Sequence, residues 1–240
     1  MFGYGRAVRG IGTVVNVITV LAGTLAGVVL GARLPERLRT AVLQAVGLVT
    51  LVIGARDALG TRNVVFPLVA LILGAVIGEA LRIEARLDAL GQAVRRRLAR
   101  GEAEESRFVE GFVAASLLFC VGPLTILGSI RDGLGGPDHA QLLLVKAALD
   151  GVVSVAFASI MGWGVGFSAL TVVAVQGTLT LGASAADRLL TDRMIVEMTA
   201  TGGVIVIGIG LRLLDLKKVA VASFLPALVL APIGVALFAR

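Results

Sequence analysis

The chain has 240 residues, of which 57% are hydrophobic and 16% charged, and its mean hydropathy is +0.96. Average soluble proteins carry about 25% charged residues, and a soluble domain this apolar would expose large hydrophobic patches. The composition therefore excludes an ordinary soluble domain and predicts an all-α, polytopic helical membrane protein. A transmembrane barrel is disfavoured because the apolar runs do not alternate with period two.

The residue counts exclude several classes of function. One cysteine, Cys120, leaves no internal disulfide or thiolate cluster, and one histidine, His139, leaves no His-rich metal site. We expect no cofactor, no metal and no enzyme activity, because H-E-x-x-H and recognisable nucleophile arrangements are absent. The net charge of +6 marks a cytoplasmic membrane face rather than nucleic-acid binding. The expected partners are the lipid bilayer and a small-molecule or ion solute.

Apolar runs of about 20 residues, the length that crosses a bilayer, predict eight transmembrane spans in one membrane domain covering 1–240. The first is interpreted as a retained helix rather than a cleaved signal peptide, and the uncharged junction "MGWGVGFS" as a tight turn or helix break. The predicted spans are 11–32, 38–58, 64–82, 107–131, 139–161, 164–184, 192–214 and 218–239.

One long segment, 83–107, separates the third and fourth spans and is rich in arginine. Its apolar residues follow helical spacing, which indicates a basic amphipathic helix on the membrane surface or, equally, a solvated helical hairpin. The positive-inside rule places this segment in the cytoplasm and both chain termini outside.

The sequence predicts an internal repeat; the alternative is that helices rich in Gly, Val and Leu resemble one another by composition alone. "GLVTLVIGARDAL" at 47–59 is echoed at 122–134 by "GPLTILGSIRDGL" and, at a constant offset of 156 residues, by "GVIVIGIGLRLL" from Gly203. The first unit, 1–82, therefore corresponds to the second, 164–240, with central spans in 107–163. An odd number of spans separates matching elements, so the units cross the membrane in opposite directions. Such an inverted repeat suits alternating access.

The runs "FVAASLLFCVGPLTILGSIRDGL", "LLLVKAALDGVVSVAFASIMGWGVGFSAL" and "EMTATGGVIVIGIGLRLLDLKK", with the start "GTVVNVITVLAGTLAGVVLGARLPERL", resemble a bacterial family. This is the family of YdfK/YqgA-type integral membrane proteins, whose function is unknown. The resemblance covers nearly the whole chain except 83–107. It implies a multi-pass protein of the bacterial inner membrane, often guessed to be a transporter, with no established substrate.

Ionisable groups in the predicted spans are costly and are the first functional candidates. Lys146 and Asp150 stand one helical turn apart, and Ser154 continues their face. They could bind a proton or substrate, or form a salt bridge that only orients the helix. Glu197 is either a coupling acid or a helix-start acid. Gln176 and Thr178, like Asn16 and Gln44, are site residues or interhelical hydrogen-bonding groups.

Helix breaks give a second set of candidates. Pro123 removes a backbone hydrogen bond and disfavours helix at Gly122, so the span 107–131 should kink or unwind there, with the hydroxyls of Thr125 and Ser129 beside it. Gly202 and Gly203 form a weaker counterpart in the span 192–214, and paired breaks point to a transport site.

Small residues four apart indicate close helix contacts that could also join copies of the chain in a homo-oligomer. They are Gly23, Gly27 and Gly31 in the first span and Gly74 and Gly78 in the third.

The sequence thus favours a small, proton-coupled secondary transporter of a small polar solute, a carboxylate or amino acid, working by alternating access. The alternatives are a passive channel and a non-transporting membrane scaffold or assembly protein.

Overall fold

The computed structural model describes residues 9–33, 35–86, 89, 102–120, 123–135 and 139–238, and the regular secondary structure within those ranges is all helix. The helices, in chain order, are α1 (Ile11–Gly31), α2 (Glu36–Ala58), α3 (Val65–Ala80), α5 (Glu102–Cys120), α6 (Pro123–Leu134), α7 (Gln141–Met161), α8 (Gly164–Leu181), α9 (Ala183–Leu189), α10 (Asp192–Leu213), the 3-10 turn η1 (Val221–Phe224) and α11 (Ala227–Phe238).

Each predicted span contains helix within its described residues, which confirms the helical membrane class. Among the described residues, six helices are long and apolar enough to cross a bilayer, and α5 with α6 forms a seventh candidate bent by 60°. The remaining predicted span, 64–82, corresponds to α3. Its 16 residues extend only about 24 Å, against roughly 30 Å of hydrocarbon. The count of eight spans therefore stays a prediction.

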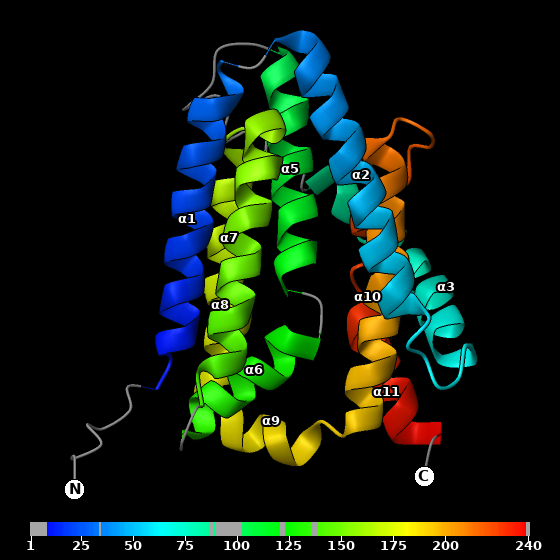
Figure 1. The fold of residues 1–240 in the computed structure, drawn as a ribbon. Helices are drawn as coiled ribbons and strands as arrows, with labels where there is room; N and C mark the ends of the chain where they lie inside the picture. Colours follow the sequence, from blue (N-terminus) through cyan, green and yellow to red (C-terminus); the bar gives the residue numbers. More distant parts are fainter. Residues whose placement is uncertain are drawn as a thin grey trace, which may run out of the picture.

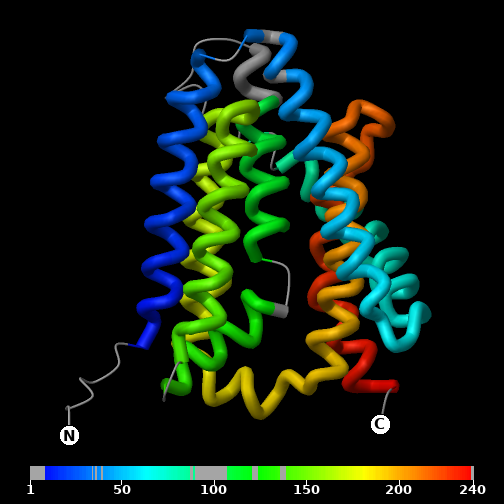
Figure 2. Tube along the Cα trace, viewed as in Figure 1, coloured from blue at the N-terminus to red at the C-terminus, as the bar shows by residue number. Residues whose placement is uncertain are grey.

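The helices form two groups that stand side by side (Figure 1). One group contains α1, α5, α6, α7 and α8, and the other contains α2, α3, α10 and α11. Helix α9 lies across the lower end of the molecule and leads from the first group to the second. The described chain starts and finishes at this same end (Figure 2).

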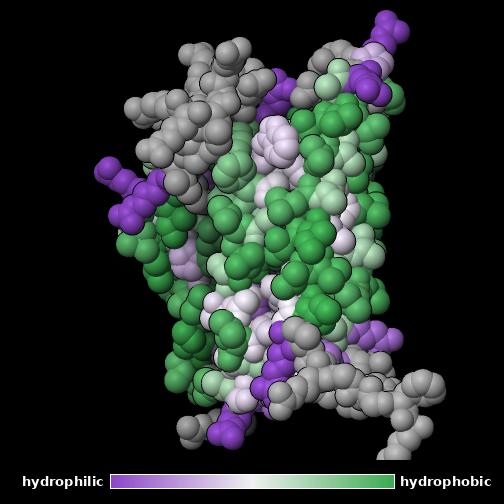
Figure 3. Space-filling view, turned by 90° about the vertical axis from the view of Figure 1, so that its left-hand side faces the viewer, coloured by the Kyte–Doolittle hydropathy of each residue, from purple (hydrophilic) through white to green (hydrophobic). Residues whose placement is uncertain are grey.

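The outer surface is that of a membrane protein. A broad hydrophobic band covers the middle of the face in Figure 3, and hydrophilic side chains gather toward its two ends. Large apolar side chains point outward from several helices, for example Val52 at 69% exposure and Leu170 at 67%. Lipid is the solvent that accommodates such a band.

Glycines bring two pairs of helices into close contact. Gly23, Gly27 and Gly31 of α1 lie against the backbone carbonyls of Gly151, Val155 and Ser159 on α7, leaving no room for a Cβ. Gly74 and Gly78 of α3 lie in the same way against Ala227 and Ser223. The small-residue faces expected to serve a homo-oligomer are thus covered within the chain.

Helices α2 and α10 meet through pairs of contacts that exchange under the offset of 156 residues. Gly47 of α2 lies against Leu214 at the end of α10, and Gly203 of α10 lies against Ala58 at the end of α2. In the same manner Gly54 contacts Ile207, and Gly210 contacts Leu51. Each contact becomes its partner when 156 is added to one residue number and subtracted from the other.

The two expected helix breaks have different outcomes. Helix α5 ends at Cys120 and α6 begins at Pro123, so the chain changes direction where a break was expected, although Gly122 lies outside the described residues. Helix α10, in contrast, runs unbroken through Gly202 and Gly203, and the expected break there is wrong. Both glycines are buried, and Gly203 lets the α2 backbone approach closely.

The other connections agree with the sequence where the structure describes them. Gly162 adopts a left-handed conformation, with φ of 69°, in the tight turn that joins α7 to α8. Of the predicted basic segment 83–107, residues 83–86 and 89 are helical and 102–107 belong to α5, whereas 87–88 and 90–101 lie outside the described residues. The amphipathic surface helix therefore stays a prediction.

A buried ion pair as the candidate functional site

The centre of the first helix group holds a buried ion pair. The Lys146 ammonium donates to both carboxylate oxygens of Asp150, at 2.8 and 2.6 Å, across one turn of α7. The side chain of Asn16, on α1, donates from Nδ2 to Asp150 Oδ2 at 3.0 Å. Only 7% of the Lys146 side chain and 8% of the Asp150 side chain are exposed, so the predicted pairing is present and screened from solvent.

An aromatic ring completes the surroundings of the ammonium. Lys146 Nζ lies 5.8 Å from the centroid of the Phe119 ring, within cation–π range, and Phe119 is fully buried near the end of α5. The break between α5 and α6 therefore follows the residue that covers Lys146. This arrangement places the helix break next to the ion pair. The sequence predicted the break and the pair, but not the contact through Phe119.

Several buried polar atoms on α1, α7 and α8 have no hydrogen-bond partner among the described residues. They are Asn16 Oδ1, Thr24 Oγ1, Ser154 Oγ and both polar atoms of Gln176. Asn16, Ser154 and Gln176 are 0% exposed. An unpaired buried amide or hydroxyl costs about 1–3 kcal/mol, and such groups in proteins usually bond to bound water or to a ligand.

The hydroxyls predicted beside the break line α6. Thr125 Oγ1 donates to the Phe119 carbonyl at 2.9 Å, spanning the break, and Ser129 Oγ donates to the Thr125 carbonyl at 2.6 Å. Thr180 of α8 donates to the Ser129 carbonyl at 3.3 Å. The bond from Thr125 joins α6 to α5, and the bond from Thr180 joins α8 to α6.

Two predicted site residues lie elsewhere. Thr178 faces outward from α8, whereas its neighbour Gln176 is buried. Glu197 is fully buried but fastens the α2–α3 linker. Its carboxylate accepts from Thr61 Oγ1 at 2.5 Å and from the backbone N–H groups of Arg62 and Asn63 at 2.9 and 3.1 Å. Glu197 thus has a structural place in the second helix group.

Sequence reasoning gave no site role to a second buried carboxylate, Asp132 of α6. It is fully buried and lies 3.5 Å from His139 Nε2, while Thr13 and Thr180 bring their hydroxyls to within 3.4 Å of each other nearby. The signal available was the Arg-Asp pair that the segments 47–59 and 122–134 share. Nothing local in the sequence distinguishes this Asp from Asp57, which is paired with exposed Arg56.

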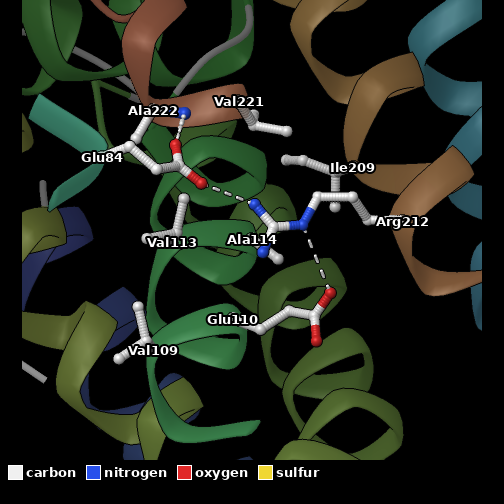
Figure 4. A pocket seen from close by; sticks show the side chains of 9 residues that line it. All are labelled: Glu84, Val109, Glu110, Val113, Ala114, Ile209, Arg212, Val221 and Ala222. Atoms are coloured by element: carbon white, nitrogen blue, oxygen red, sulfur yellow. Dashed lines mark hydrogen bonds and ion pairs between the residues drawn. The ribbon is translucent and has the colours of Figure 1, made fainter. Parts of the chain in front are cut away.

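A surface cavity lies between α5, α10 and η1 (Figure 4). Arg212 of α10 reaches into it and pairs with Glu84 at 2.8 Å and with Glu110 at 3.6 Å. Glu84 also accepts from the Ala222 backbone N–H, and Arg212 donates to the Val219 carbonyl. The charged groups here pair with one another and hold the α10–α11 linker in place. Under the 156-residue offset, this linker corresponds to the α2–α3 linker, which Glu197 holds.

The fold and the buried ion pair define a polytopic α-helical membrane protein with a polar centre inside an apolar bundle. The chain belongs to the family described as "Protein of unknown function (DUF554)", whose model matches residues 11–236. It is 28% identical to the uncharacterized membrane protein YdfK of Bacillus subtilis over 226 residues, 92% of this chain and 94% of that one. It is 33% identical to the uncharacterized protein YqgA of Escherichia coli over 224 residues, with the same shares covered. No solved structure matches the chain.

Proposed function

We propose that this protein is a small secondary transporter of the bacterial inner membrane, which moves a small carboxylate or amino acid together with a proton. The observation that carries the proposal is the Lys146–Asp150 pair, buried in a transmembrane helix, together with unpartnered buried polar atoms of Asn16 on α1, Ser154 on α7 and Gln176 on α8. Intramembrane ionisable residues of this kind commonly mark solute pathways and proton relays.

A purely structural role explains these residues poorly. Replacing a buried ion pair by packed apolar residues is often neutral or stabilising, so stability alone does not favour keeping the pair. Unpartnered amides and hydroxyls add further cost. The cost is offset when a ligand bonds to these groups during part of a transport cycle.

Charge balance gives the proposed mechanism. While Asp150 is ionised, both of its oxygens hold the Lys146 ammonium. A proton that adds to Asp150 neutralises it and leaves the ammonium free to bind a carboxylate. The polar atoms of Gln176 and Ser154 then offer hydrogen bonds to the rest of the solute. Proton and anion enter together, so the net charge of the site stays constant, and both leave before the pair re-forms.

The fold supports alternating access. The exchanged contacts between the antiparallel helices α2 and α10 support an inverted repeat, the arrangement that alternating access commonly uses. Each unit supplies one helix, α1 or α8, to the group that holds the ion pair and two helices to the other group. The described chain starts and finishes at one end, as an even number of crossings requires.

The proposal is tested in two steps. Purified protein is screened by thermal shift against small monocarboxylates and amino acids, since a bound ligand raises the unfolding temperature. Uptake of each stabilising compound is then measured in proteoliposomes with and without an inward proton gradient. We expect Asp150→Asn to abolish gradient-driven uptake, whereas Glu197→Gln, a matched change of another buried carboxylate, retains it.

The other functions give different results in the same assays. Full gradient-driven uptake by folded Asp150→Asn protein would reject the mechanism. Conductance far above carrier turnover, without proton coupling, indicates a channel. The absence of any stabilising compound and of any flux indicates a scaffold.

A further inference from the structure

Asp132 and His139 form a buried acid–base pair that the ion-pair site does not include. Asp132 Oδ2 accepts from the Gly12 backbone N–H, in the first turn of α1, at 3.1 Å, and Oδ1 lies 3.5 Å from His139 Nε2. The Asp132 side chain is 0% exposed and that of His139 is 9% exposed. Imidazole is the side chain that ordinarily changes charge near neutral pH. The pair lies where α1 and α7 begin, close to one end of the bundle.

Helix α1 places this pair in line with the ion pair. The Gly12 backbone N–H bonds Asp132, and the Asn16 side chain bonds Asp150. Gly12 and Asn16 are four residues apart on the buried face of α1, about 6 Å along the helix axis. Two buried carboxylates therefore lie about one helical turn apart along the same face.

One polar residue, Thr13, lies between Gly12 and Asn16 along α1 and is buried. The hydroxyls of Thr13 and Thr180 lie 3.4 Å from each other across α1 and α8. One turn further into the bundle on each helix are Asn16 and Gln176, whose unpartnered atoms can hold water. Hydroxyls, amides and water are the groups through which a proton passes between buried acids.

The other charged groups near the path are few among the described residues. Arg9, before α1, lies beside Gly135, and Arg131 is exposed on α6. On α9, Asp187 and Arg188 are exposed. Lys146 faces Asp150 at the inner end, and α8 contributes the uncharged side chains of Thr180 and Gln176.

We propose that His139 and Asp132 are the proton entry of the transporter and deliver the coupled proton to Asp150. His139 takes a proton from water and passes its Nε2 proton to Oδ1 of Asp132. Asp132 passes it through the Thr13 and Thr180 hydroxyls and bound water to the Asp150 carboxylate. Each carrier returns to its initial protonation state, and one proton is gained by Asp150 for one removed from the aqueous side. The inference rests on the proposed function, in which Asp150 carries the coupled proton.

The test measures proton arrival at Asp150 without any solute. Protein in lipid nanodiscs is subjected to a rapid drop in pH, and the carbonyl band of protonated Asp150, identified by its loss in Asp150→Asn, is followed by time-resolved infrared spectroscopy. We expect His139→Ala to slow the rise of this band about a hundredfold, the scale of a lost proton-transfer group, with an unchanged final amplitude. Added imidazole should restore the rate, which it would not do for a structural defect.

Controls keep the outcomes separate. Asp132→Asn should slow the band as His139→Ala does, and Asp187→Asn, an exposed acid at the same end, should leave the rate unchanged. If Asp132→Asn protein fails to fold, His139→Ala with imidazole decides alone. A wild-type rate in His139→Ala overturns the proton entry while leaving the proposed function intact. If Asp150 never becomes protonated in the wild-type protein, the proposed proton coupling is wrong, and the proposed proton entry through His139 and Asp132 is then wrong as well.

Discussion

Substitution of Lys146 by methionine is expected to destabilise the protein strongly. Methionine keeps most of the side-chain length, but Asp150 loses the donor that binds both of its oxygens and retains only Asn16. Because the Asp150 side chain is only 8% exposed, water does not replace the ammonium. Removing one member of a buried ion pair typically costs about 3–5 kcal/mol. We expect a loss in this range.

The double variant Lys146→Met/Asp150→Asn separates charge from packing. It removes both charges, and the amide introduced by Asp150→Asn can still accept the hydrogen bond from Asn16. The stability should therefore return to within about 1–2 kcal/mol of the wild type. The same variant should bind no carboxylate, because the ammonium is gone.

The assay is reversible unfolding in mixed detergent micelles with increasing denaturing detergent, followed by circular dichroism. If the Lys146→Met protein is as stable as the wild type, the conclusion that this variant leaves the Asp150 carboxylate buried without a counter-charge is refuted. A double variant no more stable than the single one would show that lost packing, rather than charge, causes the destabilisation.

Three further outcomes are expected from other contacts. Gly27→Val should destabilise by about 1–3 kcal/mol because the side chain meets the Val155 carbonyl, whereas Gly177→Ala, with no neighbour within 4 Å of the added Cβ, should stabilise α8 by up to about 1 kcal/mol. Equal thermal unfolding of these two variants would contradict the helix contact. Glu197→Gln should lower the free energy of unfolding by about 1.5–3 kcal/mol, because charge-assisted hydrogen bonds are lost, and should speed amide hydrogen exchange at 61–63. Unchanged exchange at 61–63 would show that Glu197 does not hold the linker. Arg212→Met should speed amide hydrogen exchange at 219–224. It should lower the free energy of unfolding by no more than about 1 kcal/mol, because the paired side chains are 23–30% exposed. A decrease as large as that of Lys146→Met would contradict this exposure.

The sequence predicted the helices well because the bilayer imposes a simple length requirement on apolar runs. It also predicted the Lys146–Asp150 pair, since residues one turn apart on a helix are neighbours. The change of direction after α5 followed from Pro123, which cannot continue the hydrogen bonding of the preceding turn.

The remaining features depend on contacts between distant residues. Gly12 and Asp132 are 120 positions apart, and Thr61 and Glu197 are 136 apart, so no local pattern links them. The error at Gly202 and Gly203 has a related cause. Glycine permits a break but does not impose one, and here the demand for close approach to α2 keeps α10 straight.

Each of the two proposed repeat units is divided between the two helix groups, and this division has a mechanical consequence. Helix α1 belongs to one group and α2 to the other, and the same holds for α8 and α10. If the groups rotate relative to each other, the connection between α1 and α2 must bend at one end of the molecule and α9 must tilt at the other (Figure 1). These two joints, one in each proposed repeat unit, are unequal, because one is a short connection between helices and the other includes a seven-residue helix. Stiffening the α1–α2 connection should therefore slow opening toward one side of the membrane more than toward the other.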